Sequence, residues 1–151
     1  MVGGGWSVRE KRNDASRTAP DAPFTLFVVD VSSGAREQLT DPVTVTFTRA
    51  GAGAAVTIKW TVVEYVSGVS VQRGTTLAPG TTNNVAISSV NTGKSFPIIS
   101  YSNADTTFGA NDFYKAKLTS STNLEISAVS SATTTVSWQV VEYQNTSVQT
   151  G

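Results

Sequence analysis

The sequence predicts an all-β protein, an antiparallel β-sandwich of about nine strands with an irregular N-terminal arm. Thr, Ser and Val number 22, 18 and 20 among the 151 residues, a composition that favours strands and turns over helices. Apolar residues alternate with polar ones at period two in several short segments, and turn residues separate these segments. No segment keeps a helical periodicity for longer than a turn or two.

The first 23 residues differ in composition from the rest, so we divide the chain into an arm, 1–23, and a sandwich domain, 24–151. A run of three glycines, a charged cluster and two prolines argue against a strand or an amphipathic helix in the arm. One interpretation is a disordered tail. The other is an arm that lacks regular structure but packs Trp6 on a neighbouring subunit, since a solvated tail does not need a large aromatic residue.

The strands of the domain are predicted from alternation bounded by turn residues. In one of the clearest, Val43, Val45 and Phe47 alternate with Thr. The expected strands are 24–31, 42–49, 56–66, 69–72, 84–90, 95–101, 113–118, 124–129 and 135–143.

An internal repeat covers two of these strands. The sequences IKWTVVEY and VSWQVVEY align Trp60 with Trp138, and both continue into Ser-Val-Gln, at 70–72 and 147–149. Each copy follows a strand and a turn of small residues, and two copies are too few for a solenoid. The copies are either a duplicated hairpin within one sandwich or the shared edges of two half-sheets. Both predict that Trp60 and Trp138 are buried on equivalent strands.

Apolar residues occupy both faces of the repeated strand. The face opposite the two Trp residues carries Val63, Tyr65, Val141 and Tyr143. An antiparallel strand with one wet face is polar on that side, so this face is covered either within the fold or by another subunit. We expect a subunit interface in a homo-oligomer, because a domain of this size rarely holds three layers.

Candidates for chemistry are few, and we expect neither an enzyme nor a bound cofactor or metal. The absence of Cys and His excludes thiol nucleophiles, imidazole bases and the usual zinc ligands. Glu64 and Glu142 are either an acid–base pair or one structural residue copied by duplication, with Arg73 as a possible partner of the first. The structural interpretation is favoured because catalysis needs two unlike environments.

The segment 101–114 gathers oxygen-bearing and aromatic side chains. It is a Ca²⁺ loop, a sugar-binding surface, or a plain connection whose Asn and Asp form turns and whose aromatics fill the core. The first lacks the usual spacing of calcium loops, and the last is favoured. The candidate ligand residues are Tyr101, Asn103, Asp105, Asn111 and Asp112.

Charge and hydropathy bear on partners and location. With 11 basic and 11 acidic residues the formal net charge is +0, which argues against nucleic-acid binding by counterion release. No apolar run is long enough for a membrane span or has the form of a secretory signal peptide. The expected place of synthesis is the cytoplasm, without a membrane partner.

The Thr/Val strand, the small-residue turn, W-x-V-V-E-[YF] and S-V-Q-x-G together resemble virion-associated β-sandwich proteins of tailed bacteriophages. More loosely, the segments 85–90 and 138–141 resemble H-type lectin domains, which are trimeric sugar-binding sandwiches. The resemblance implies a trimeric protein exposed on a particle or fibre.

Two functions follow from this resemblance. The first is a structural protein of a phage virion, a capsid decoration, head-fibre or tail component, made in the host cytoplasm. Its partners would be copies of itself and other virion proteins such as the major capsid protein. The second is a glycan- or receptor-binding module of a phage fibre, with the segment 101–114 at its tip and host-surface glycans as ligands.

Overall fold

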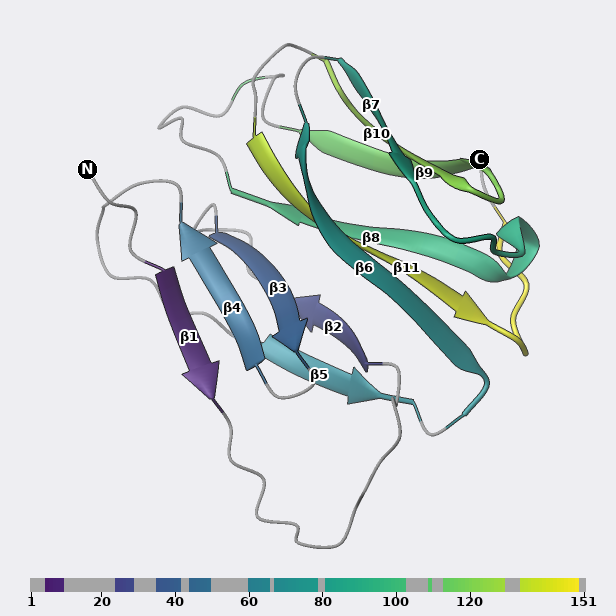
Figure 1. Cartoon of the computed structure of the whole chain (residues 1–151), viewed down its shortest axis with the longest axis horizontal. Helices are drawn as coiled ribbons and strands as arrows, with labels where there is room; N and C mark the ends of the chain where they lie inside the picture. The colour runs from purple at the N-terminus through teal and green to yellow at the C-terminus, as the bar shows by residue number, and fades with distance from the viewer. Residues whose placement is uncertain are drawn as a thin grey trace, which may run out of the picture.

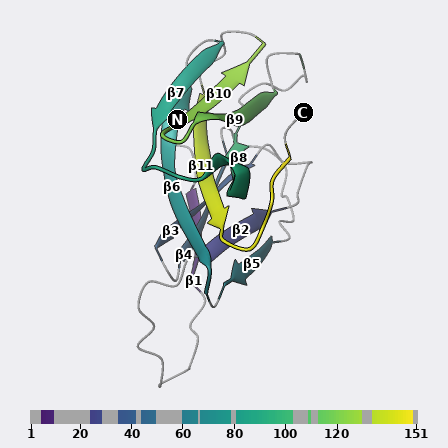
Figure 2. The same ribbon diagram turned by 90° about the vertical axis from the view of Figure 1, so that its right-hand side faces the viewer.

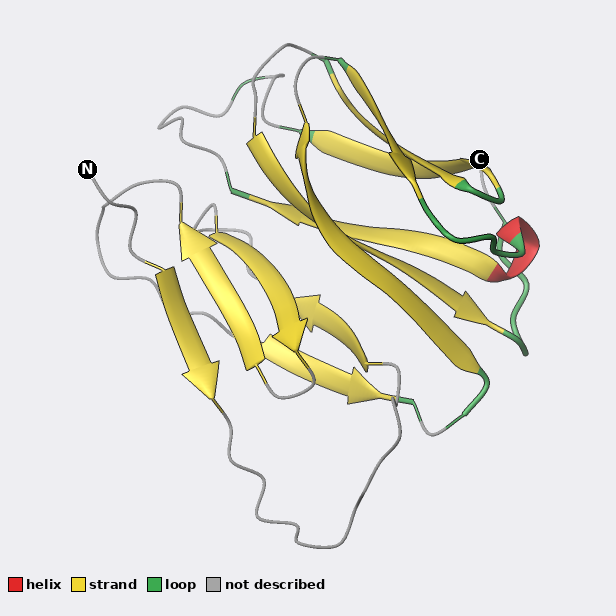
Figure 3. Ribbon diagram, viewed as in Figure 1, coloured by secondary structure: helices red, strands yellow, loops and turns green. Residues whose placement is uncertain are grey.

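The structure, a computed structural model, has an all-β fold, as the sequence predicts. Its regular elements are strands β1 to β11 and one turn of 3-10 helix at Thr92–Lys94, with no α-helix in the part of the chain that is described (Figure 3). The described residues are 5–9, 24–28, 35–41, 44–49, 60–65, 67–78, 81–102, 109, 113–129 and 134–149.

The C-terminal half is a sandwich of two three-stranded antiparallel sheets (Figure 1). One sheet has the order β6-β11-β8, formed by Val69–Ala78, Thr134–Tyr143 and Ser95–Tyr101. The other has the order β7-β10-β9, formed by Thr82–Ala86, Asn123–Ala128 and Tyr114–Ser120. Side chains from both sheets and from the β7–β8 connection form one core of Ala78, Ile87, Val90, Tyr114, Leu124, Ile126, Val136 and Val140.

The N-terminal half contains one three-stranded sheet and one two-stranded sheet. The first has the order β1-β4-β3, formed by Gly5–Arg9, Thr44–Arg49 and Ala35–Asp41. The second pairs β2, Phe24–Val28, with β5, Trp60–Glu64. Val45 and Phe47 of β4 are buried, on one face of the strand.

The two halves repeat the same pairing of strands. Strands β1, β4 and β3 correspond to β7, β10 and β9, while β2 and β5 correspond to β8 and β11. In the first half Val45 lies opposite Leu39, and in the second Leu124 lies opposite Leu118. Each residue number rises by 79 from the first pair to the second. We call β1–β5 the first unit and β7–β11 the second unit.

The correspondence extends to an irregularity in the ladder. Immediately after Leu39 the pairing of β3 with β4 skips Thr40, and after Leu118 the pairing of β9 with β10 skips Thr119. A bulge of this kind is a specific feature of a strand pair rather than a random defect. Its presence at the same place in both halves shows that the duplication covers five strands, well beyond the repeated Trp strand.

The structure corrects the expectation of a duplicated hairpin. Strands β4 and β5 lie in different sheets, and so do β10 and β11, so each copy of the repeat passes from one sheet to another. Similarity between the copies establishes which strands are equivalent, but it carries no information about which strands are paired. The strand that follows β5, β6, crosses to the second unit and pairs with β11 along its whole length, from Val69 opposite Tyr143 to Ala78 opposite Thr134.

All nine expected strands overlap observed strands, and two observed strands were not expected. The first is β1, Gly5–Arg9, which pairs antiparallel with β4 and corrects the expectation that residues 1–23 lack a strand. A short segment with little strand propensity of its own forms a strand when a neighbour offers an open backbone edge. The second is β3, whose sequence AREQLTD is too polar to show the alternation expected of a buried strand.

Candidate functional site

The site that the repeated strand points to is the junction between the two units, on the outer face of β11. Val136, Trp138 and Val140 face the sandwich core, where Trp138 packs against the buried cluster. Residues of the opposite face alternate with them, and of these Val141 is only 1% exposed and lies outside the core cluster. The side chain of Val141 is therefore covered within a single chain, which is the alternative to the subunit interface that we favoured.

A third layer is possible because the chain holds two stacked units rather than one sandwich. Strand β3 of the first unit contacts both β8 and β11 of the second. Figure 2 shows the strands of the first unit beside the β6-β11-β8 sheet. The expectation of an interface rested on treating 24–151 as a single two-layer domain, whereas each five-strand unit accounts for only about half of the chain.

Two equivalent tyrosines meet at one end of the junction. The rings of Tyr65 and Tyr143 lie 5.8 Å apart between centroids, with an angle of 46° between their planes. Gly68 lies beside Tyr143 with φ of 75°, a conformation that favours glycine, and its carbonyl accepts a hydrogen bond from Gln144 N at 2.8 Å. This end of the junction is thus held by one contact between equivalent residues of the two units.

Polar side chains occupy the other end of the junction. Arg36 of β3 donates from Nη1 to Ser137 Oγ at 2.7 Å and to Gln38 Oε1 at 3.3 Å. Arg73 of β6 is half-buried on the same side, and desolvation lowers the pKa of its guanidinium group. Gln139 Oε1 is buried and has no hydrogen-bond partner among the described atoms.

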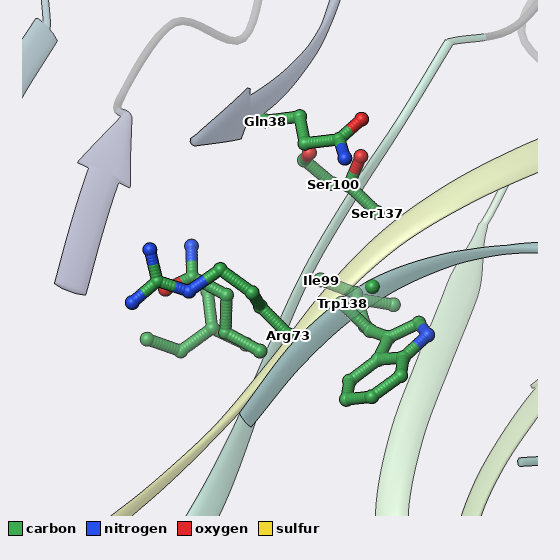
Figure 4. Close-up of a pocket in the computed structure, with 9 residues that line it drawn as sticks. Gln38, Arg73, Ile99, Ser100, Ser137 and Trp138 are labelled. Carbon is green, nitrogen blue, oxygen red and sulfur yellow. The ribbon is translucent and has the colours of Figure 1, made fainter. Parts of the chain in front are cut away.

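A small pocket lies among these residues. Its lining includes Gln38, Arg73, Ser100, Ser137 and Trp138, and Figure 4 shows Arg73 and Trp138 pointing to opposite sides of the sheet. The cavity volume is about 10 Å³, which is close to the minimum for one water molecule. Gln139, whose Oε1 has no partner among the described atoms, is also one of the lining residues. The pocket is thus part of a packed junction, with no room for a substrate.

On the core side of the sheet, Trp138 packs over a glycine. Gly74 of β6 lies directly opposite Trp138, and a Cβ atom at Gly74 would come within 2.7 Å of Cζ2 of the indole ring. Trp138 is half-buried and its Nε1 is buried without a hydrogen-bond partner in the described part of the chain. The expected burial of Trp138 is therefore met in part, and the side chain of Trp60 lies outside the described residues.

The two repeat glutamates are accounted for as far as the structure describes them. Glu142 accepts a hydrogen bond at Oε1 from Asn91 N at 2.9 Å, and so ties the segment before the 3-10 helix to β11. This is the structural role favoured by the sequence. The side chain of Glu64 lies outside the described residues. Arg73, the possible partner of Glu64, lies opposite Gln139 of β11.

The segment 101–114 is described only at its ends. The rings of Tyr101 and Tyr114 lie 4.9 Å apart, and Tyr101 Oη accepts a hydrogen bond from Tyr114 N at 3.2 Å. Tyr114 belongs to the core and Tyr101 packs against it, so both rings serve the fold, as the favoured interpretation predicts. The other candidate ligand residues, Asn103, Asp105, Asn111 and Asp112, lie outside the described residues.

The remaining assembly candidates are placed as follows. Trp6 lies on β1 opposite Phe47 of β4, and its side chain is outside the described residues. Val63, Tyr65 and Tyr143 are half-buried. Sequence reasoning missed the polar end of the junction, Arg36 and Gln38, because β3 was not predicted. The glycine of the S-V-Q-x-G pattern, Gly74, lies opposite Trp138, a pairing that the sequence alone does not show.

No known protein family, curated protein or solved structure matches the chain. Among the described residues there is no helix of the length and apolarity that a membrane span requires. In the same residues no three Asp or Glu side chains come together as metal ligands would.

Proposed function

We propose that the protein is a self-assembling structural component of a bacteriophage virion, a capsid decoration, head-fibre or tail protein that works as a homo-oligomer. The observation that carries the assembly part of this proposal is the position of β6. The second unit is completed by β6, a strand that lies outside the five strands of either unit and follows the first unit along the chain. A unit whose sheet is completed by an added strand suits repeated assembly.

The described part of the molecule uses its polar and aromatic groups for packing. Arg36 and Ser137 bind the units together, Glu142 anchors a backbone N–H, and the Tyr101–Tyr114 pair lies against the core. The phage setting is drawn from the sequence resemblance, with the trimer and the major capsid protein as the proposed partners and the virion as the location. No cofactor is part of the proposal.

The proposal is tested by sedimentation equilibrium of the full chain up to high micromolar concentration, together with cosedimentation with emptied phage capsids. We expect a homo-oligomer, with a trimer as the closed form, and retention on the particle. A monomer at all concentrations that does not bind the particle would contradict the proposal. Binding in a glycan array without association or particle binding would favour a receptor-binding module instead.

A further inference from the structure

The free edge of β5 differs from the same edge of the equivalent strand β11. Strand β11 lies between β6 and β8, whereas in the described part of the chain β5 is paired only with β2. Because β2 corresponds to β8, the edge of β5 away from β2 corresponds to the edge of β11 that β6 occupies. In Figure 2, β5 lies at the lower edge of the ribbon, beyond β2. An open strand edge offers unpaired N–H and C=O groups to a further strand.

The sequence that fills this edge in the second unit occurs once more in the chain. Strand β6 contains Ser70-Val71-Gln72, which lies opposite Glu142-Val141-Val140 of β11. After β11 the chain reads Ser147-Val148-Gln149, with three residues between Tyr143 and Ser147, as β6 follows β5 after a similarly short link. The segment after β11 is therefore the counterpart of β6 in sequence and in position.

The glycine of the S-V-Q-x-G pattern explains why the pattern accompanies a Trp strand. In β6 it is Gly74, which faces Trp138 so closely that a Cβ atom would overlap the indole ring. In the later copy the same place is taken by Gly151, and the equivalent of Trp138 is Trp60. A strand that begins Ser-Val-Gln-x-Gly is thus suited in both copies to lie beside a W-x-V-V-E strand.

We infer that the segment beginning at Ser147 of a second copy adds to the edge of β5, antiparallel, with Val148 opposite Val63 and Gly151 opposite Trp60. This rests on the proposed self-assembly and names the surface through which it occurs. The register is that of Val71 opposite Val141 and of Gly74 opposite Trp138. Backbone hydrogen bonds supply affinity in such strand addition, and the valine and glycine positions supply specificity.

The occupant is a second copy because the segment of the same chain is directed elsewhere. Val148 N donates to Gly93 O at 2.9 Å, which turns the chain after Tyr143 toward the 3-10 helix of its own unit. Addition to β5 breaks that hydrogen bond and forms several backbone hydrogen bonds in its place. The contact joins two different surfaces, β5 of one copy and the segment after β11 of the next. Such a head-to-tail contact closes into a ring, of which a trimer is one, or continues as a filament.

The register is tested by disulfide trapping. The chain has no Cys of its own, so no native thiol competes with the introduced ones. Val63→Cys and Val148→Cys are made in separate chains, mixed and oxidised. Residues directly opposite in an antiparallel pair have Cα atoms about 4.5–5.5 Å apart, within the range that a disulfide spans. The matched control is Ser147→Cys mixed with Val63→Cys, since neighbouring residues of a strand point to opposite faces. We expect a cross-linked dimer in the first mixture and little in the control.

A second measurement avoids any substitution in the folded body. A chain that ends at Thr146 lacks the added strand but keeps β11 entire. Sedimentation equilibrium should show association weakened by about tenfold or more, the loss expected for several backbone hydrogen bonds.

The outcomes separate this inference from the proposal on which it rests. A wild-type oligomer that the Cys pair does not trap and that the truncation does not weaken would overturn the strand addition and leave self-assembly standing. A disulfide that forms only within a single chain carrying both Cys residues would show that the chain's own segment fills the edge, and would overturn the role of the second copy. A wild-type chain that stays monomeric would overturn both.

Discussion

The two units share a strand plan but differ in how their Trp strands are completed. In the second unit β11 has a neighbour on each edge, and Val136, Val140 and Val141 are at most 1% exposed. In the first unit the described neighbour of β5 is β2 alone, and Val63, the equivalent of Val141, is half-buried. Two nearly identical strand sequences thus occupy a central and an edge position. The central position of β11 therefore depends on β6, the strand that lies beside it, and not on the sequence of β11 itself.

The largest expected effect is on the core of the completed unit. Leu124 is fully buried between the two sheets, and Leu124→Ala should lower the free energy of unfolding by about 3 kcal/mol, since it removes buried carbon atoms and leaves a cavity. The matched change in the first unit is Val45→Ala, at an equivalent position that is 6% exposed. Val45→Ala should lower the free energy of unfolding by less, because fewer carbon atoms are removed.

Urea unfolding followed by Trp fluorescence measures both variants. Because β6 follows directly after the first unit and completes the second, and because β3 packs on β8 and β11, we expect one cooperative transition for the wild type and for each variant. Two separate transitions, with Leu124→Ala lowering the midpoint urea concentration of only one, would contradict this. They would show that the units unfold independently and that β6 does not couple them.

The strand positions of the second half follow closely from the sequence, whereas the organisation into two units does not. Alternation places β8, β9, β10 and β11 to within two residues at most ends, because their side chains alternate between core and solvent or junction. Pairing is a long-range property, and the repeat predicted that Trp60 and Trp138 are equivalent without showing that β6 crosses between the units. The equivalent dipeptides Leu39-Thr40 and Leu118-Thr119 contain the bulges, but two residues are too few to be recognised as a repeat.

The sequence predicted the apolar part of the candidate site but not the polar strand that packs on it. The apolar outer face of the Trp strand was identified from Val141 and Tyr143, and it is indeed covered. What covers it was assigned to another subunit, because the polar strand β3 that brings Arg36 to the junction has no periodic signal. A strand whose inward side chains hydrogen-bond across a junction does not show the apolar alternation by which strands are recognised.

A middle-sized effect is expected from the contact between Gly74 and Trp138. Gly74→Val places carbon atoms where the indole ring lies, so either the ring or β6 must shift, and the free energy of unfolding should fall by roughly 1–3 kcal/mol. The control is Gly93→Ala, where the nearest atom to the added Cβ would be the flexible Asn91 Oδ1 at 3.4 Å.

Combining the substitution with Trp138→Ala isolates this contact. If the clash with the ring is the cause, Gly74→Val should cost less in the Trp138→Ala background than in the wild type, as a double-mutant cycle in urea would measure. If Gly74→Val lowers the free energy of unfolding equally in both backgrounds, the effect comes from the backbone of β6. The indole ring would then not be the reason for a glycine at position 74.

The smallest expected effect concerns a cross-strand pair that only the second unit has. Lys117 Nζ lies 3.1 Å from Glu125 Oε1, and the two residues are directly opposite each other on β9 and β10. At the equivalent place in the first unit Gln38 lies opposite Thr46, because there the strand faces the junction with the second unit instead of solvent.

The ion pair is on the surface, with the Lys117 side chain 62% exposed, so Glu125→Gln should lower the free energy of unfolding by about 0.2–1 kcal/mol. The loss should shrink as salt is raised, since screening weakens the pair in the wild type. Urea unfolding at low and high salt measures this, with Lys115→Gln as the control for removing one charge from the same surface without touching the pair. A loss above about 2 kcal/mol that is independent of salt would mean that Glu125 is held by more than this pair, and that the outer face of β9 and β10 is a buried contact like its counterpart in the first unit.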